Sequence, residues 1–224
     1  MSIDLLRMAL SADSGEGADA VTGRILDAAL AQFEDFGLRR STMEDIARRC
    51  GMSRITIYRR FPKKENLVQA VVLRELQSFL NCLERVGADA PGELSAQDKM
   101  VERIALALQY LGNHPLLRRL LRTEPESILP SLTVHGAPVV DMAREHIAAF
   151  IRKDLFGTRT PPAEAERQVQ VVAEVGVRIV LSFILTPSSA IPMETLEDAR
   201  AFARDLIAPV HASVLSELAR AAAE

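Results

Sequence analysis

Residues 41–67 read STMEDIARRCGMSRITIYRRFPKKENL, and this stretch decides the fold. It holds two short segments in which apolar residues recur at helical spacing, separated by Gly51. Ser41 and Glu44 form the S-x-x-E pattern of a capping box, which predicts where the first helix begins. Gly51 supplies the backbone freedom that a sharp turn needs, and Ser53 is a suitable N-cap for the second helix. The stretch therefore predicts a helix-turn-helix.

A third helix precedes this pair. Apolar residues at spacings of four, four and three predict one buried face, formed by Ile25, Ala29, Phe33 and Phe36. Gly37 is expected to end this helix in the manner of a left-handed C-terminal cap. Ala47 is small where the two later helices cross closely. The three helices are expected to share a core that contains Ile46, Met52, Ile57 and Phe61.

The residues left on the outside of the 53–60 helix are suited to bind DNA. They are Arg54, Thr56, Arg59 and Arg60, with Tyr58 beside them. Arginine can bond guanine through two hydrogen bonds, threonine can touch a thymine methyl group or a phosphate, and tyrosine can reach phosphate oxygens. Lys63 and Lys64 lie at the positive end of the next helix, which predicts a phosphate clamp. Half-buried packing is the structural alternative for Tyr58.

The charge distribution is uneven. The 224 residues carry a net charge of −3, but residues 37–64 hold nine basic residues against two acidic ones. This window therefore carries +7 and the rest of the chain −10. A basic block on an acidic body predicts a polyanion site confined to one end, the alternative being a solvated charged helix face.

The remaining chain is predicted to be all-α. Helices are expected from Pro62 to Val86, from Ser95 to Asn113, briefly after His114-Pro115, and over 139–153, 163–185 and 196–224, the last with a possible kink at Pro209. Pro125, Pro130 and Pro138 predict a loop-rich stretch. We expect a flexible arm over residues 1–20, a helix-turn-helix domain over 21–66 and a larger helical domain over 67–224.

Several classes of protein are disfavoured. No apolar run reaches the roughly 18 residues of a membrane span, and the N-terminus lacks the features of a secretion signal, which predicts a cytoplasmic protein with no membrane partner. Two cysteines and four scattered histidines predict neither a disulfide framework nor a metal site. No nucleophile motif or phosphate loop is present, so we expect no enzyme, no catalytic residue and no cofactor. Cys50 and Cys82 could sense redox change, but a buried cysteine that packs as a small apolar residue is the favoured interpretation.

The pattern of residues 21–70 resembles the N-terminal domain of the TetR family of transcriptional regulators. The resemblance is carried by Ile25, Ala28-Ala29, Phe33, Gly37, Ser41-Thr42, Ile46-Ala47, Gly51-Met52-Ser53-Arg54 and the run from Thr56 to Leu67. It departs from the usual pattern at Ile55, where a small residue or proline is common, and at Cys50. Ile55 lies near the base-reading end, so this departure bears on which operator is read.

The resemblance implies roles for individual residues. Arg54, Ile55 and Thr56, following the N-cap Ser53, would approach base edges of double-stranded operator DNA. Thr42 and Lys64, with Lys63, would hold phosphates at the flanks of the groove. The remaining candidates would contact phosphates or further bases: Tyr58, Arg59 and Arg60.

In the family resembled, the larger domain binds a small molecule and forms a homodimer. The 163–185 helix is apolar around much of its circumference, which predicts a subunit interface with the C-terminal helix, or else burial within one subunit. Glu174 and Arg178 are spaced to pair with each other, and a structural ion pair is favoured over a role in the pocket. The other candidates for lining an effector site are Tyr110, His114, Met142, His146 and Phe150.

These features predict a ligand-responsive regulator, a repressor that binds palindromic operator DNA as a dimer and is released by a small-molecule effector. The alternative is a DNA-binding accessory protein whose large domain recruits a protein partner and binds no small molecule.

Overall fold

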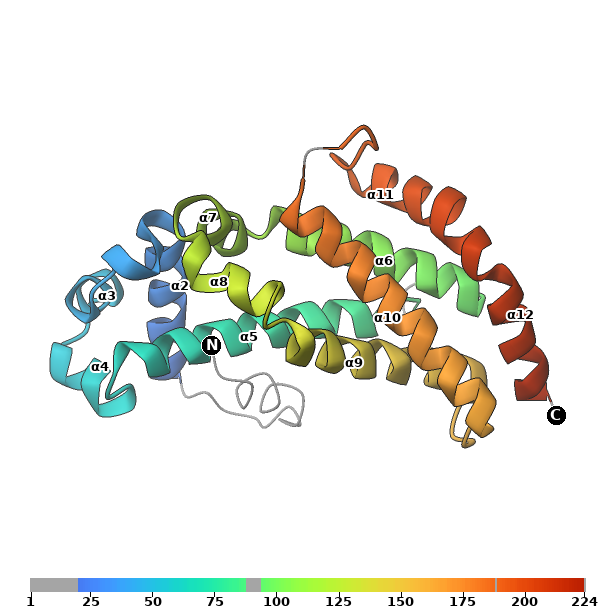
Figure 1. The fold of residues 1–224 in the computed structure, drawn as a ribbon. Helices are drawn as coiled ribbons and strands as arrows, with labels where there is room; N and C mark the ends of the chain where they lie inside the picture. The colour runs from blue at the N-terminus through green and yellow to red at the C-terminus, as the bar shows by residue number, and fades with distance from the viewer. Residues whose placement is uncertain (1–19, 88–93, 188, 224) are drawn as a thin grey trace. The chain divides into compact units, whose positions relative to one another are not determined.

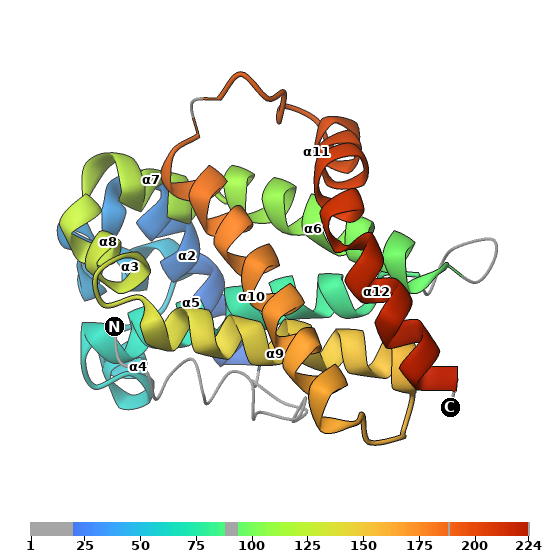
Figure 2. The ribbon, with the colours of Figure 1, turned by 45° about the vertical axis from the view of Figure 1, so that its right-hand side comes forward.

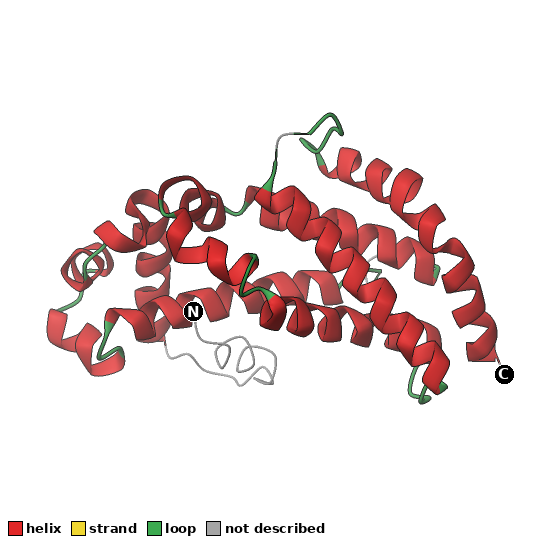
Figure 3. Ribbon diagram, viewed as in Figure 1, coloured by secondary structure: helices red, strands yellow, loops and turns green. Residues whose placement is uncertain are grey.

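The computed structural model describes residues 20–87, 94–187 and 189–223, and every regular element within them is a helix (Figure 3). The predicted all-α fold class is confirmed. Contacts divide the chain into two compact units. The first unit comprises the chain up to Ser78 and His114–His135, and the second comprises Phe79–Asn113 and Gly136–Glu224.

The first unit contains the helix-turn-helix and two later helices. Its helices are α2 (Ala20–Arg40), α3 (Met43–Cys50), α4 (Arg54–Arg60), most of α5 (Lys64–Glu84), α7 (Pro115–Thr123) and α8 (Pro125–Leu132) (Figure 1). Their core contains Ile25, Phe33, Ile46, Ile57, Phe61, Leu67 and Val71. Met52 packs against it and is only partly buried. This is the core that the sequence pattern predicts, except that Phe36 is exposed because the helix breaks at the next residue.

Residues 115–132, which form α7 and α8, were expected in the larger domain. They pack instead into the first unit because Leu116 and Leu120 of α7 are buried in the same core as Phe33 of α2. The boundary expected after residue 66 lies inside α5, which continues without a break to Glu84.

The second unit is built from the remaining helices. They are α6 (Ala96–Asn113), α9 (Ala137–Phe156), α10 (Ala163–Leu185), α11 (Leu196–Phe202), the π-helix η1 (Ala203–Ile207) and α12 (Ala208–Ala223). Helices α9 and α10 lie side by side in Figure 2, and α11 packs on α6. The rings of Phe183 on α10 and Phe202 on α11 meet edge to face, with their centroids 5.0 Å apart.

Helix α10 is long and strongly apolar. By length and mean hydropathy alone it could cross a membrane, and 33% of its most apolar window is buried in the structure. A single such helix is weak evidence for a membrane span, because core helices of soluble proteins meet the same criterion. One face of α10, with Val169, Ala173 and Val177, is buried within the unit, whereas Val171 is exposed.

Two proline-rich segments differ from the prediction. The stretch after Pro125 is expected to be loop-rich, but α8 forms there with Pro125 in its first turn, where a missing N–H costs nothing, and it tolerates Pro130 in its interior. The C-terminal helix is interrupted before Pro209, by η1, in which the N–H of Ala208 donates to the carbonyl of Ala203.

Candidate nucleic-acid interface

Helix α4 presents most of its side chains outward. Its N-cap is Ser53, whose hydroxyl oxygen accepts a hydrogen bond from the backbone N–H of Thr56 at 3.2 Å. Ile57 alone on this helix is fully buried. The side chain of Ile55 is 79% exposed, and the other outward residues are Arg54, Tyr58, Arg59 and Arg60. Tyr58 is therefore exposed, not a packing residue, and Thr56 is half-buried.

Helix α3 begins one residue later than the expected cap. Thr42, not Ser41, is the N-cap, and it forms a capping box with Asp45 instead of Glu44. The hydroxyl of Ser41 is used elsewhere, because it is buried and donates to the carbonyl oxygen of Gly37 at 2.6 Å. Thr42 itself is exposed at the start of α3, beside the expected DNA-binding face.

The turn between α3 and α4 has the geometry that the sequence predicts. Gly51 has φ 65° and ψ 33°, the left-handed conformation that favours glycine, and its N–H donates to the carbonyl of Arg48. A guanidinium from α2 caps the same helix end, because Nη2 of Arg24 donates to the carbonyl of Cys50 at 2.9 Å. The thiol of Cys50 is buried and donates to the carbonyl of Ala47, whereas Cys82 is exposed on α5.

Several basic candidates have partners within the first unit. The guanidinium of Arg54 forms an ion pair with Glu44. Nη1 of Arg60 donates to the hydroxyl of Thr22 at 2.7 Å. The ammonium of Lys64 donates to the carbonyl of Leu38, while Lys63 is exposed.

Arg48 and Arg49, which lie outside the expected reading face, also have acidic partners. Arg48 pairs with Asp45 at 3.0 Å and Arg49 with Asp35 at 2.6 Å. The side-chain hydrogen bond from Thr42 holds the pKa of Asp45 below its usual value, and the charge of Arg48 acts in the same direction. Asp45 is therefore ionised at neutral pH and keeps the capping box intact.

The candidates for an effector site are divided between the two units. His114 belongs to the first unit, where its Nδ1 accepts from the N–H of Leu117 at the start of α7. Tyr110 packs against Phe79, with ring centroids 5.2 Å apart, in the second unit. His146 meets Phe150 edge to face at 4.8 Å on α9, and Met142 lies half-buried one turn earlier.

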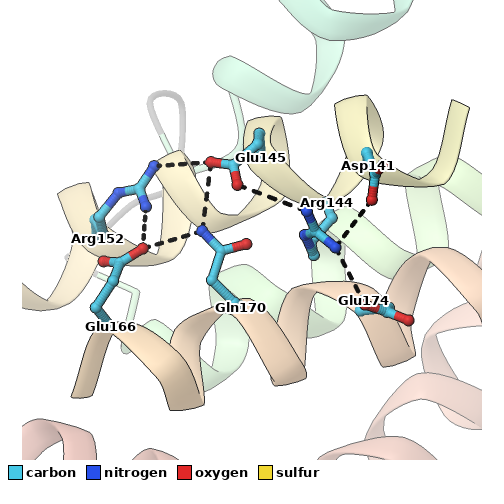
Figure 4. A network of polar contacts seen from close by, with 7 residues as sticks. All are labelled: Asp141, Arg144, Glu145, Arg152, Glu166, Gln170 and Glu174. Carbon is cyan, nitrogen blue, oxygen red and sulfur yellow. Dashed lines mark hydrogen bonds and ion pairs between the residues drawn. The ribbon is translucent and has the colours of Figure 1, made fainter. Parts of the chain in front are cut away.

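Glu174 and Arg178 form the ion pair that their spacing predicts, with the carboxylate and guanidinium 2.7 Å apart. Glu174 also accepts from Arg144 of α9, so the pair belongs to a polar network between α9 and α10 (Figure 4). The same network joins Arg152 to Glu166 at 2.5 Å. Hydrogen bonds from Arg178 and then Arg144 hold the pKa of Glu174 below its usual value. This arrangement agrees with the structural interpretation of the pair.

A buried polar cluster in the second unit was not predicted. The guanidinium of Arg103 forms an ion pair with Asp154 and lies 4.7 Å from the ring centroid of Phe150. Burial lowers the pKa of His146, which faces the same ring. Arg103 and Asp154 lie 51 residues apart, so no local pattern could have signalled the pair. Among the described residues, no group of three His, Cys, Asp or Glu side chains is placed to hold a metal ion.

Family profiles match both the helix-turn-helix region and the larger helical part of the chain. The profile described as "Bacterial regulatory proteins, tetR family" matches residues 25–71, and that of the "Bacterial Tetracyclin repressor, C-terminal domain" matches residues 96–209.

Individual relatives are more distant. An uncharacterized HTH-type transcriptional regulator of Mycobacterium tuberculosis is 29% identical over 102 residues, which are 46% of this chain and 50% of that protein. The chain thus spans about half the length of the first curated relatives it matches. The HTH-type transcriptional regulator AlkX of Mycobacterium tuberculosis is 25% identical over 180 residues, 77% of this chain and 81% of that protein.

Solved structures agree in fold. The TetR family repressor AlkX from Dietzia sp. strain DQ12-45-1b has a TM-score of 0.59 at 23% identity and covers 90% of this chain and 100% of its own. A putative TetR-family regulator from Mesorhizobium loti has a TM-score of 0.58 at 18% identity, over 88% of this chain and 93% of that one. With its helix-turn-helix and its larger helical part both matched, the chain belongs to the TetR family of bacterial regulatory proteins, which are DNA-binding regulators of transcription.

Proposed function

We propose that this protein is a cytoplasmic, dimeric repressor that binds palindromic operator DNA and is released by a small-molecule effector. The observation that carries the proposal is helix α4, which turns its basic and polar residues outward while Ile57 anchors it to the core. A short helix exposed in this way fits the major groove of DNA, where base edges are read.

The two ends of the DNA-reading surface would make different kinds of contact with DNA. Arg54, Ile55 and Thr56 at the start of α4 would approach base edges, with Ser53 holding that end of the helix in place. Thr42, Lys63 and Lys64 would hold phosphates on either side of the groove. The outward residues of the later turn would add phosphate or base contacts: Tyr58, Arg59 and Arg60.

The proposed dimer uses the apolar surface of α10 and α12, which pack on each other. Val171 on α10 is 59% exposed and Val210 on α12 is 71% exposed, and Leu206 of η1 is also exposed. Exposed valines and leucine on neighbouring elements favour association with a second copy of the chain. Two recognition helices held about one DNA turn (~34 Å) apart would then meet successive major grooves of a palindrome.

Release would follow from a shift between two dimer conformations, one with recognition helices spaced for the operator and one without. Of the effector-site candidates, Tyr110, Met142, His146 and Phe150 lie in the second unit. The related AlkX structure from Dietzia is described as that of a repressor implicated in biodegradation of n-alkanes. The n-alkanes are therefore the first effectors to test.

Selection of bound sequences from random double-stranded DNA tests the first half of the proposal. We expect a palindrome with half-sites about one turn apart. If no sequence is enriched at moderate salt, the regulator proposal is overturned.

Release of the selected DNA by candidate effectors tests the second half. A palindrome that no small molecule releases, together with a second unit that captures a protein partner, would favour the alternative of an accessory DNA-binding protein.

A further inference from the structure

The corner between α2 and α3, residues 37–41, is held in part by side chains from distant parts of the sequence. Gly37, with φ 81° and ψ 172°, breaks α2 before its last turn, and only glycine adopts this conformation readily. Its extended ψ differs from the left-handed cap expected from the sequence. The corner leads directly into Thr42, the N-cap of α3, so its geometry sets where the helix-turn-helix begins.

Three backbone groups of this corner have side-chain partners. The carbonyl of Gly37 accepts from the hydroxyl of Ser41, and the carbonyl of Leu38 accepts from the ammonium of Lys64. The backbone N–H of Arg39 donates to both carboxylate oxygens of Glu124, at 3.2 Å each. Glu124 therefore supplies the one partner that comes from outside the helix-turn-helix and α5.

The side chain of Glu124 is buried and closely packed at this position. It lies at the junction of α7 and α8 and is only 5% exposed, which is rare for a carboxylate. A Cβ atom on Gly37 would lie 2.1 Å from Oε1 of Glu124 and 3.5 Å from Nε of Arg119. The carboxylate thus rests against the bare Cα of Gly37, a position that no larger residue would leave open to it.

The elements around the contact are fixed by apolar packing. Figure 1 shows α7 beside α2, and Leu116 and Leu120 anchor α7 in the core of the first unit. A second contact is peripheral, because the ion pair between Arg39 and Glu126 at 2.6 Å has both side chains mostly exposed. Exposed ion pairs contribute little to stability, so the buried carboxylate is the stronger constraint.

We infer that Glu124 is a positioning residue for operator recognition, acting through the backbone N–H of Arg39 to hold the corner that places Thr42 and α3. This inference rests on the proposed function, since its readout is operator affinity. Substitution of Glu124 leaves every residue of the reading surface unchanged, so a loss of specific binding by a folded variant cannot come from a lost DNA contact.

The direction of the change in operator affinity distinguishes a positioning role of Glu124 from a simple effect of its charge. Replacement of Glu124 or Glu126 by alanine removes one negative charge from the first unit, which by itself strengthens binding to DNA of any sequence. We expect Glu124→Ala instead to lower operator affinity about tenfold, because it leaves the N–H of Arg39 without its acceptor. Glu126→Ala, the matched control two residues away, should stay within about twofold of the parent.

A second variant allows the inference to be tested even if Glu124→Ala unfolds. Glu124→Gln retains one acceptor oxygen at nearly the same volume, so it should fold and lose about threefold or less of the operator affinity. Gly37→Ala should also lower operator affinity, because alanine is strained at φ 81° and its methyl group would collide with Oε1 of Glu124. Its effect and that of Glu124→Ala should be less than additive, as expected for neighbours that share one contact.

Amide hydrogen exchange distinguishes positioning from a general loss of stability. In Glu124→Ala, exchange should accelerate at residues 38–45 and stay unchanged in α5. Uniform acceleration over residues 20–71, with operator affinity restored on cooling, would overturn the inference. So would parental operator affinity in folded Glu124→Ala.

Binding of the unsubstituted parent chain to its selected operator distinguishes failure of the proposed function from failure of the positioning role. If the parent selects no operator, the proposed function fails. If the parent binds its operator and the Glu124 and Gly37 variants bind it equally well, only the positioning role fails.

Discussion

Arg54 is the residue with the most direct expected effect on sequence recognition. It stands at the start of α4, paired with Glu44 in the DNA-free chain and largely exposed. Removal of a bidentate base contact weakens specific binding by about 1–3 kcal/mol. We expect Arg54→Ala to show this loss and to relax base preference at one position in each half-site, measured against operators with every single-base change. An unchanged preference profile would mean that Arg54 does not read a base.

Lys63 and Lys64 provide a matched pair for phosphate contacts. Each alanine variant should weaken binding to all sequences alike and reduce the slope of log affinity against log salt by about 1. Only Lys64→Ala should also lower the melting temperature, because the ammonium of Lys64 donates to the carbonyl of Leu38. Salt titrations and thermal unfolding of both variants measure the two effects. Equal melting temperatures would show that this hydrogen bond does not stabilise the first unit.

At the scale of the element, the capping box of α3 links stability to pH. Since the folded-state pKa of Asp45 is lowered, its ionised form stabilises the fold above the unfolded value near 3.8 and loses this contribution as the pH falls through the lower folded value. We expect Asp45→Asn to be less stable than the parent at neutral pH and to approach it as the pH falls below 3.8, in thermal unfolding across that range. Asp205→Asn, with the same charge change on the exposed surface of η1, serves as the control. A difference between Asp45→Asn and the parent that persists at low pH would contradict this linkage.

The same helix shows why caps are difficult to predict from local pattern. Ser41 with Glu44 and Thr42 with Asp45 both satisfy the spacing of a capping box. The choice follows from the break at Gly37, whose carbonyl accepts a hydrogen bond from the hydroxyl of Ser41 and leaves Thr42 to cap the helix. The π-helix before Pro209 is a similar case. The sequence predicts a kink at this proline, but the chain accommodates it with a π-helical turn instead.

At the scale of the molecule, local periodicity was sufficient to predict most helices and the outward face of α4. It predicted Ile57 as the buried anchor and Gly51 as the turn, because both depend on neighbours within a few residues. It could not place Glu124, which lies 85 residues from Arg39 in sequence. It also could not predict that Arg54 has an acidic partner, because pairing across two helices depends on how they cross.

The apolar surface of α10 and α12 leads to a prediction about assembly. If Val171 and Val210 are buried between two subunits, a carboxylate at either position must be desolvated, at a cost of several kcal/mol per charge, and a two-fold axis doubles that cost. We expect Val171→Glu and Val210→Glu to be monomers at micromolar concentration by light scattering and to bind operator far more weakly, since each monomer reaches one half-site. Val134→Glu adds the same charge at an exposed valine of the first unit, in the turn after α8, and should remain dimeric. A parent that is already monomeric, or glutamate variants that still form dimers, would place the subunit interface elsewhere and remove this support for paired recognition helices.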